Sequence, residues 1–328
     1  MNLIINKYLP IFILLFLCLF LSRNLIAQSE AVNKSETSKQ KKELKYSAFI
    51  SFGSSEKTLE LRKLDYVRDE DKRLYKPNSR EVTGFDFSSE YFSLGFNYIG
   101  DFNSNANNTV RTTQKDFIYR SYFKSFFISA AHYEYYGFYL EDENLDPDID
   151  QYTRYSNLKN IGNELMILHF HNPDYIKNGF TYFSPNIKTS WSYNYGLKYF
   201  NSSTRSSQDM APLKLENDSE KELLEINQEG LSAVLGISGT YVNEGFFVMG
   251  MMNAGFIGMQ RIRTSYDNHT RQVGDFFSSY AMADIGGIAK RSRYGFALTL
   301  SSSNYDITNQ VNFDQSYSVS RFYYRYFF

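Results

Sequence analysis

Long stretches of the chain alternate hydrophobic and polar residues with a period of two. In the segment 187–199, IKTSWSYNYGLKY, the residues Trp191, Tyr193, Tyr195 and Leu197 alternate with serine, asparagine and glycine. Because successive side chains of a β-strand point to opposite faces of the sheet, this pattern predicts a long strand with one aromatic and one polar face. The same pattern recurs in residues 90–100, 230–242 and 293–307.

Looser alternation predicts further strands along the rest of the chain. They cover residues 46–53, 57–64, 81–87, 117–128, 130–140, 162–170, 246–261, 276–290 and 315–328. The tripeptides NEG (243–245) and RSR (291–293) predict tight turns between adjacent strands. Other connections, at 100–116, 141–160 and 201–229, are long and polar. We therefore expect an antiparallel sheet with short turns at one end and long loops at the other.

Strand length separates two architectures for such a sheet. A soluble β-sandwich would bury the apolar faces against each other, whereas a transmembrane β-barrel would turn them toward lipid. The run 187–199 exceeds the ~5–6 residues of a typical globular strand and reaches the ~9–11 residues that a membrane-spanning strand needs. We predict an all-β fold, an antiparallel transmembrane β-barrel of about 12 strands over residues 46–328, with long polar external loops. Roughly 10 or 14 strands are the alternatives, since bacterial single-chain barrels have even numbers.

The composition agrees with a barrel. The chain has 28 tyrosines and 29 phenylalanines but a mean hydropathy of −0.44, so aromatic and polar residues must be finely interleaved. The formal net charge of −1 gives no reason to expect a nucleic-acid partner.

The first 27 residues have the form of a secretory signal peptide. A positive charge precedes an apolar run at 9–21, and the small residue Ala27 ends the segment. The run is shorter than the ~20 residues of a spanning helix, which disfavours the alternative of an uncleaved membrane anchor. We expect residues 1–27 to be removed together with the only cysteine, Cys18, and residues 28–45 to form a flexible leader before the barrel. The predicted location is the outer membrane.

The last predicted strand ends in alternating aromatic residues, at Phe322, Tyr324, Tyr326 and Phe328. This strand resembles the C-terminal signal strand of outer-membrane barrels, which ends on phenylalanine. Barrel closure would pair it with the first strand and leave no free edge. The expected partners are outer-membrane lipid and, as the resemblance implies, the barrel-assembly machinery through the strand ending at Phe328. No oligomeric state is predicted.

A family resemblance lies in the segment 74–141. It includes Tyr75, Pro77 and Asn78 in LYKPNSREVTGFDFSSEYFSLGFNYIG, and Gly137 in YEYYGFYLED. The segment resembles the domain of unknown function 4421 family, which consists of uncharacterised bacterial outer-membrane β-barrel proteins. The resemblance implies an outer-membrane barrel and no particular activity.

The Tyr-x-Pro-Asn sequence of that segment has a structural interpretation. Pro77 fixes its φ angle and biases the residue before it toward an extended conformation, and Asn78 suits a turn, so these residues end one strand and direct the next. A ligand-binding role for Tyr75 and Asn78 is the less favoured alternative.

The search for metal ligands begins with the histidines, which are His132, His169, His171 and His269. Only His169 and His171 stand two residues apart on one predicted strand. A metal site would need a third and a fourth ligand, which the neighbouring sequence does not offer, so we expect two polar residues that face a wet lumen. The acidic run 141–150 lacks the spacing of an EF-hand calcium loop and is expected to be a solvated external loop. We predict no metal site and no cofactor.

The sequence offers no motif for catalysis or nucleotide binding. It has no G-x-S-x-G elbow, no phosphate loop and no dinucleotide fingerprint. No catalytic residue is therefore predicted, and the ligand-binding residues are unknown. A Ser–His–acid cluster assembled from neighbouring strands stays open as an alternative.

Two local predictions concern the lumen and the longest loop. The cations Arg120, Lys124, Lys188 and Lys198 are expected to face inward, where they need acidic partners; salt bridges that plug the lumen are favoured over an anion-selective pore. The segment 219–229, SEKELLEINQE, has a capping-box pattern and predicts a short helix.

The predicted function is that of a non-enzymatic outer-membrane β-barrel, with a role in small-solute passage, surface interaction or envelope integrity. Two alternatives stay open: an outer-membrane barrel enzyme that acts on lipids, and a soluble exported β-sandwich that binds a ligand.

Overall fold

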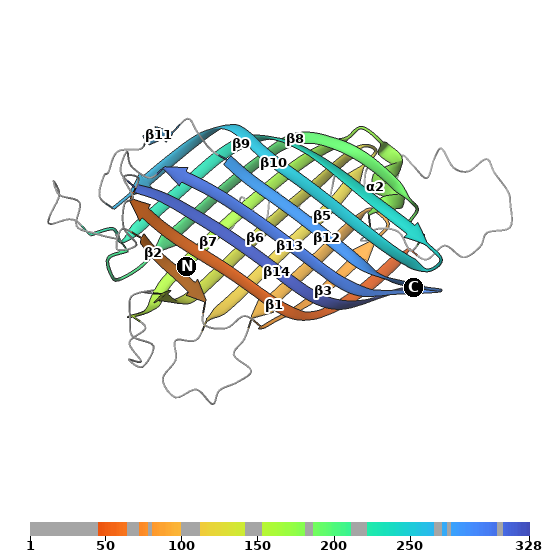
Figure 1. Ribbon diagram of the computed structural model, residues 1–328, viewed down its shortest axis with the longest axis horizontal. Helices are drawn as coiled ribbons and strands as arrows, with labels where there is room; N and C mark the ends of the chain where they lie inside the picture. Colours follow the sequence, from red (N-terminus) through yellow and green to blue (C-terminus); the bar gives the residue numbers. More distant parts are fainter. Residues whose placement is uncertain are drawn as a thin grey trace, which may run out of the picture. The chain divides into compact units, whose positions relative to one another are not determined.

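Twelve long strands form the wall of a closed antiparallel barrel in the computed structural model (Figure 1). They are β1 Tyr46–Lys63, β3 Glu81–Ser89, β4 Phe92–Ile99, β5 Thr113–Phe123, β6 Phe126–Glu141, β7 Thr153–Phe170, β8 Ser190–Arg205, β9 Glu225–Asn243, β10 Phe246–Thr264, β12 Phe277–Ala289, β13 Ser292–Asp306 and β14 Val311–Phe327. The remaining described elements are two short strands, β2 Lys72–Pro77 and β11 Arg271–Val273, and the helix α2 Pro173–Gly179.

The structure describes residues 45–63, 72–77, 81–99, 112–141, 153–180, 186–210, 222–265, 271–273, 277–306 and 311–328. The predicted signal peptide and nearly all of the predicted leader lie outside these residues. No helix among the described residues is long and apolar enough to cross a membrane.

Closure of the barrel depends on the pairing of its first and last strands. β1 and β14 pair antiparallel without interruption from Ser47 opposite Phe327 to Lys63 opposite Val311. At the chain end the N–H of Phe328 donates to the carbonyl of Tyr46 at 2.9 Å. The predicted barrel is thereby confirmed. The β-sandwich alternative is wrong, because the wall is one continuous sheet and not two packed ones.

Short turns lie at the end of the barrel where the chain terminates, which we call the turn end. Glu244 and Gly245 both have positive φ angles, +40° and +86°, as the favoured two-residue hairpin turns require. The predicted NEG turn is thus confirmed. The predicted RSR turn lies one residue earlier, at Lys290 and Arg291, and Arg293 belongs to β13. Figure 1 shows α2 at the turn end, and β2 and β11 at the opposite end, which we call the loop end.

Several predicted strand boundaries are wrong. The runs 46–53 and 57–64 form the single strand β1, whereas the run 117–128 contains a turn at Lys124 and Ser125 that separates β5 from β6. β7 begins inside the predicted loop 141–160.

The predicted helix 219–229 is also contradicted where the structure describes it, because β9 begins at Glu225. Ile226 and Gln228 are buried in the lumen, and the exposed Glu229 lies on the outer face. The period-two burial of the strand therefore replaces the helical pattern over these residues. Residues 219–221 lie outside the described part.

The outer face of the wall has two zones. Near the turn end the outward side chains are large and apolar, and many are exposed, as Phe322 (70%) and Trp191 (64%) illustrate. This belt comprises Ile50, Phe52, Phe85, Phe96, Trp191, Tyr195, Leu197, Leu235, Ile237, Val248, Met252, Ile285, Leu300, Phe322 and Tyr324. Toward the loop end the outward side chains of the same strands are polar. This collar comprises Thr58, Glu60, Arg62, Asn201, Ser203, Arg205, Asn227, Glu229, Asn304, Asn312, Asp314 and Ser316.

The wall narrows at the loop end. β1 pairs with β3 between Tyr46 and Ser54 but with β2 between Leu59 and Arg62. β6 pairs with β5 up to Tyr136 and then with β2 from Phe138 onward. One short strand therefore replaces β3, β4 and β5 in this part of the wall. Because barrel diameter grows with strand number, the loop end is narrower than the turn end.

We predict that Gly53→Ala destabilises the barrel. A methyl group at Gly53 would lie 2.0 Å from the carbonyl oxygen of Ser320 on β14, so the closing strands must separate. The expected cost is about 1–3 kcal/mol, as for other forced overpacking. The measurement is the temperature at which the compact folded band is lost on a gel.

Gly239→Ala is the matched control for this prediction. Its added methyl group would lie 3.7 Å from the Cβ of Trp191 and 3.8 Å from the carbonyl oxygen of Ser190, which is ordinary van der Waals contact. The control should unfold near the wild-type temperature. Equal behaviour of the two variants would contradict tight packing at the closure.

Candidate functional site in the barrel lumen

Packed apolar side chains fill the lumen on both sides of a central chamber. The loop-end cluster comprises Leu59, Leu61, Tyr75, Tyr135, Phe138, Leu158, Phe200, Met210, Leu223, Ile226, Ile262, Val311 and Phe313. The turn-end cluster comprises Phe127, Leu168, Phe170, Tyr175, Ile176, Phe180, Val234, Met249, Met251 and Met282. The chamber between them has a volume of about 150 Å³.

The loop-end cluster is completed by the segment that follows β8. Tyr75 donates a hydrogen bond from its hydroxyl to the carbonyl of Met210 at 3.0 Å, and Arg73 donates to the carbonyl of Asp209 at 2.8 Å. β2 thus holds Met210 in the lumen. Tyr75 is 1% exposed and is a core residue here, while Asn78 lies outside the described residues.

The turn-end cluster is completed by α2 and the residues around it. The side chain of Asn172 caps the helix by accepting a hydrogen bond from the N–H of Asp174 at 3.1 Å. Tyr175 is fully buried and its ring stacks on Phe170 at 5.6 Å. Burial raises the pKa of the Tyr175 hydroxyl above its ordinary value. The described residues between β7 and β8 therefore plug the lumen at this end.

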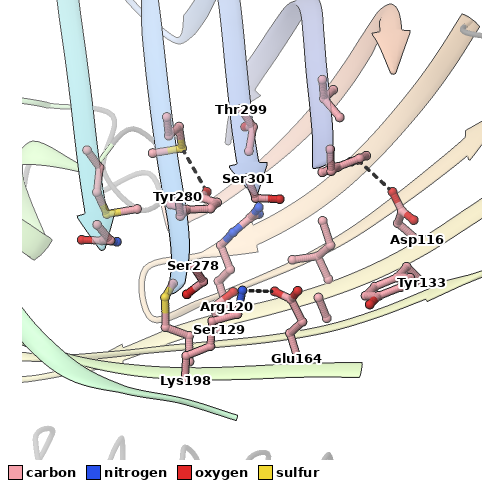
Figure 2. A pocket seen from close by; sticks show the side chains of 18 of the residues that line it. Asp116, Arg120, Ser129, Tyr133, Glu164, Lys198, Ser278, Tyr280, Thr299 and Ser301 are labelled. Atoms are coloured by element: carbon pink, nitrogen blue, oxygen red, sulfur yellow. Dashed lines mark hydrogen bonds and ion pairs between the residues drawn. The ribbon is translucent and has the colours of Figure 1, made fainter. Parts of the chain in front are cut away.

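The chamber has a charged wall and, across the lumen, a wall of small polar residues (Figure 2). Lys198 Nζ lies 3.1 Å from Glu164 Oε2. Arg321 donates to Asn97 Oδ1 at 3.2 Å, and Asp116 accepts a hydrogen bond from Tyr317 at 3.2 Å. Ser278, Thr299 and Ser301 of β12 and β13 lie across the chamber from Glu164 and Lys198.

A chain of hydrogen bonds crosses the lumen beside the chamber, on its loop-end side. Lys57 Nζ donates to Gln315 Oε1 at 3.1 Å, and Gln315 donates to Gln228 Oε1 at 3.0 Å. Ser202 donates to the same oxygen of Gln228 at 2.8 Å. Because these residues come from β1, β14, β9 and β8, the chain ties opposite parts of the wall together.

A buried ion pair stands on the turn-end side. Arg325 Nη2 lies 3.1 Å from Asp86 Oδ1, and Arg325 also donates to Ser47 at 3.1 Å. The same carboxylate accepts hydrogen bonds from Ser88 and Ser93. The pair is satisfied on all sides, which is the condition for a buried ion pair to be tolerated.

The predicted lumen cations divide into two groups. Arg120 and Lys198 line the chamber, and the ion pair of Lys198 with Glu164 agrees with the predicted lumen salt bridges. The prediction is wrong for Lys124 and Lys188. Lys124 sits exposed in the turn between β5 and β6, and Lys188 is exposed before β8 begins.

The sequence pattern missed the cation that is most deeply buried among the described residues. Arg293, expected in a turn, is fully buried, with its guanidinium 5.2 Å from the ring centroid of Phe327 and 5.9 Å from that of Phe247. Arg293 is the second residue after a hairpin turn and has the same parity as the inward residues of β13, which is the signal that could have found it.

His169 and His171 do not face a wet lumen, contrary to expectation. The ring of His169 lies 5.0 Å from the rings of Phe126 and Tyr195, whose side chains are exposed on the outer face, and His171 stacks on Tyr193 at 4.3 Å. The register of β7 sends odd-numbered side chains outward and explains the error.

His132 belongs to no reactive cluster among the described residues. His132 contacts Asn163 at 2.8 Å and Glu134 at 3.3 Å. Among the described residues, no histidine is hydrogen-bonded to a serine, and no group of three metal-ligating side chains occurs. His269 and residues 142–150 of the acidic run lie outside the described part.

Comparison of the sequence with protein-family models and with curated proteins finds no match. The resemblance to the domain of unknown function 4421 family therefore stays a prediction. Among solved structures, the chain is similar to the outer membrane protease OmpT from Escherichia coli, with 12% identity, a TM-score of 0.44, and coverage of 89% of this chain and 99% of that one.

Two further similar structures are also barrels. The translocator domain of the autotransporter NalP from Neisseria meningitidis has 9% identity and a TM-score of 0.41, with coverage of 94% of this chain and 95% of that one. The P. putida toluene transporter TodX has 9% identity and a TM-score of 0.30, with coverage of 87% and 90%.

We predict that Asp86→Asn destabilises the folded barrel by about 3–5 kcal/mol, because it leaves the buried guanidinium of Arg325 without its counter-charge. The double variant Asp86→Asn/Arg325→Met should regain most of this loss. Urea unfolding followed by circular dichroism measures both.

Asp314→Asn on the outer wall is the matched control. It removes one of the two carboxylate partners of Arg62, which keeps its ion pair with Glu60 at 3.3 Å and has a 39% exposed side chain, so the loss should stay below about 1 kcal/mol. A double variant no more stable than Asp86→Asn would contradict the role assigned to the pair.

Proposed function

We propose that the protein is a non-enzymatic outer-membrane β-barrel that is closed to free diffusion and acts at the cell surface. The collar carries the proposal. A lipid-facing strand needs only ~9–11 residues, yet β9 and β10 each have 19 and turn polar side chains outward in their loop-end parts. That polar surface is unsuited to lipid and suited to water or a partner.

The orientation follows from the general form of such barrels. Their short turns lie on the periplasmic side and their longer loops outside the cell. The belt then faces outer-membrane lipid, the collar stands above it, and the strand ending at Phe328 serves as the contact with the barrel-assembly machinery. Export requires the predicted signal peptide.

Gated passage of a small solute is a second candidate. The chamber between the two apolar clusters favours this second candidate. Packing of the lumen alone gives no reason for a polar cavity, whereas passage of a solute does. Passage would require both clusters to open.

We predict that single cysteines report the two zones on living cells. Ser316→Cys in the collar should react with a membrane-impermeant maleimide on intact cells, whereas Phe322→Cys in the belt, on the same strand, should not. Lys290→Cys at the turn end should react only after the outer membrane is permeabilised. Reaction of Lys290→Cys on intact cells, or protection of Ser316→Cys, would contradict the proposed arrangement.

We also predict that the wild-type barrel shows no steady conductance in planar lipid bilayers, because packed clusters occupy the lumen on both sides of the chamber. Insertion is verified by the heat-dependent mobility of protein recovered from the same lipid. A stable ohmic conductance would contradict the closed state and favour an open pore.

A further inference from the structure

We infer that the central chamber binds a small organic carboxylate with a short apolar body. The inference goes beyond the surface role and does not depend on it. It rests on the charge of the chamber, on polar atoms that lack partners, and on the division of its lining into charged and apolar parts.

The chamber lining carries more positive than negative charge. Its cations are Lys57, Arg120, Lys198 and Arg321, and its anions are Asp116 and Glu164. His132 also borders it, but its side chain bonds to Asn163 on the outer face. Cations gathered around one small chamber repel one another, and an anionic ligand would offset this repulsion.

Polar atoms without partners point to the same ligand. Asn253 on β10 is 6% exposed, and neither its Oδ1 nor its Nδ2 has a hydrogen-bond partner among the described residues. Buried amides are normally hydrogen-bonded, so this one has the capacity to donate to a bound carboxylate.

Gly255, two residues along the same face, keeps the space open. A methyl group there would lie 2.4 Å from Ser278 Oγ and 3.2 Å from Ser232 Oγ. Even one added carbon would therefore press against the lining of the chamber.

The turn-end side of the chamber is apolar. Its lining residues there belong to the turn-end cluster and are Phe127, Phe180, Val234, Met251 and Met282. A cavity of roughly 150 Å³ is large enough for benzene. A carboxylate with a ring-sized body therefore fits both the volume and the polarity, with its charge toward Arg321 and Lys198 and its body toward the methionines.

Benzoate is the probe, and benzyl alcohol is its uncharged counterpart of similar size. Isothermal titration of the detergent-purified full-length protein, first shown to be folded by its heat-dependent mobility, should give saturable 1:1 binding of benzoate. Benzyl alcohol should bind at least about tenfold more weakly, because it loses charge-assisted hydrogen bonds. Absence of benzoate binding to the folded wild type, or equal affinity for the two compounds, would overturn the inference.

Variants separate the chamber from nonspecific binding. Arg321→Gln should weaken benzoate binding about tenfold or more, and Gly255→Val should abolish it by filling the cavity. Arg261→Gln removes a charge from the exposed outer face of β10 and should leave binding unchanged.

If Arg321→Gln loses the mobility shift, Asn253→Ala provides the second test in the same assay. If Gly255→Val and whichever of Arg321→Gln and Asn253→Ala is folded both bind benzoate as tightly as the wild type, the inference is overturned. The cysteine labelling of the collar is independent of this titration, so failure of either proposal leaves the other standing.

Discussion

A β-sheet in lipid is stable only when every backbone N–H and C=O has a partner, because hydrocarbon offers none. In this protein the constraint falls on one seam, where β1 and β14 pair along their whole length. Gly53 allows the two backbones to approach there. The alternation of side chains that sends aromatics outward also sends charges, amides and serines inward. The register of this seam therefore determines which side chains line the lumen as well as which form the belt.

A barrel of this width cannot be filled by wall side chains alone. The chain answers at the loop end by narrowing, with β2 taking the place of three strands, and by returning Met210 into the lumen. At the turn end it inserts α2. Neither of the two clusters fills the middle of the lumen. There, charged and polar side chains from β1, β5, β7, β8, β10 and β14 surround the chamber. The chamber is thus the part of the lumen that the two fillings leave over.

Period-two alternation predicted the fold class and the strand number because lipid exposure and lumen burial repeat at every second residue. The alternating runs number 13, one more than the strands of the wall, because the single strand β1 contains two of them. The boundary between β5 and β6 lies at Lys124 and Ser125, a few residues before the position that the pattern predicts. A turn built on a lysine with φ of +52° carries no glycine or proline signal, so the run 117–128 shows no break at this turn.

The chamber was beyond sequence reasoning for a different reason. Lys57 and Gln315 are hydrogen-bonded although 258 positions separate them, and the match of β2 with β6 depends equally on long-range register. Only parity within a strand can be assigned locally, and a slip of one residue reverses it, which is why His169 was placed in the lumen. The inward orientation of Lys198 is predicted correctly, because β8 is long and its side chains alternate strictly. The same alternation continues past the belt, so the collar and the loop-end cluster lie on the two faces of the same strand segments. Substitutions in the collar therefore act on the surface that a partner would meet, while the adjacent inward positions act on the lumen, and the two roles are physically separable one residue at a time.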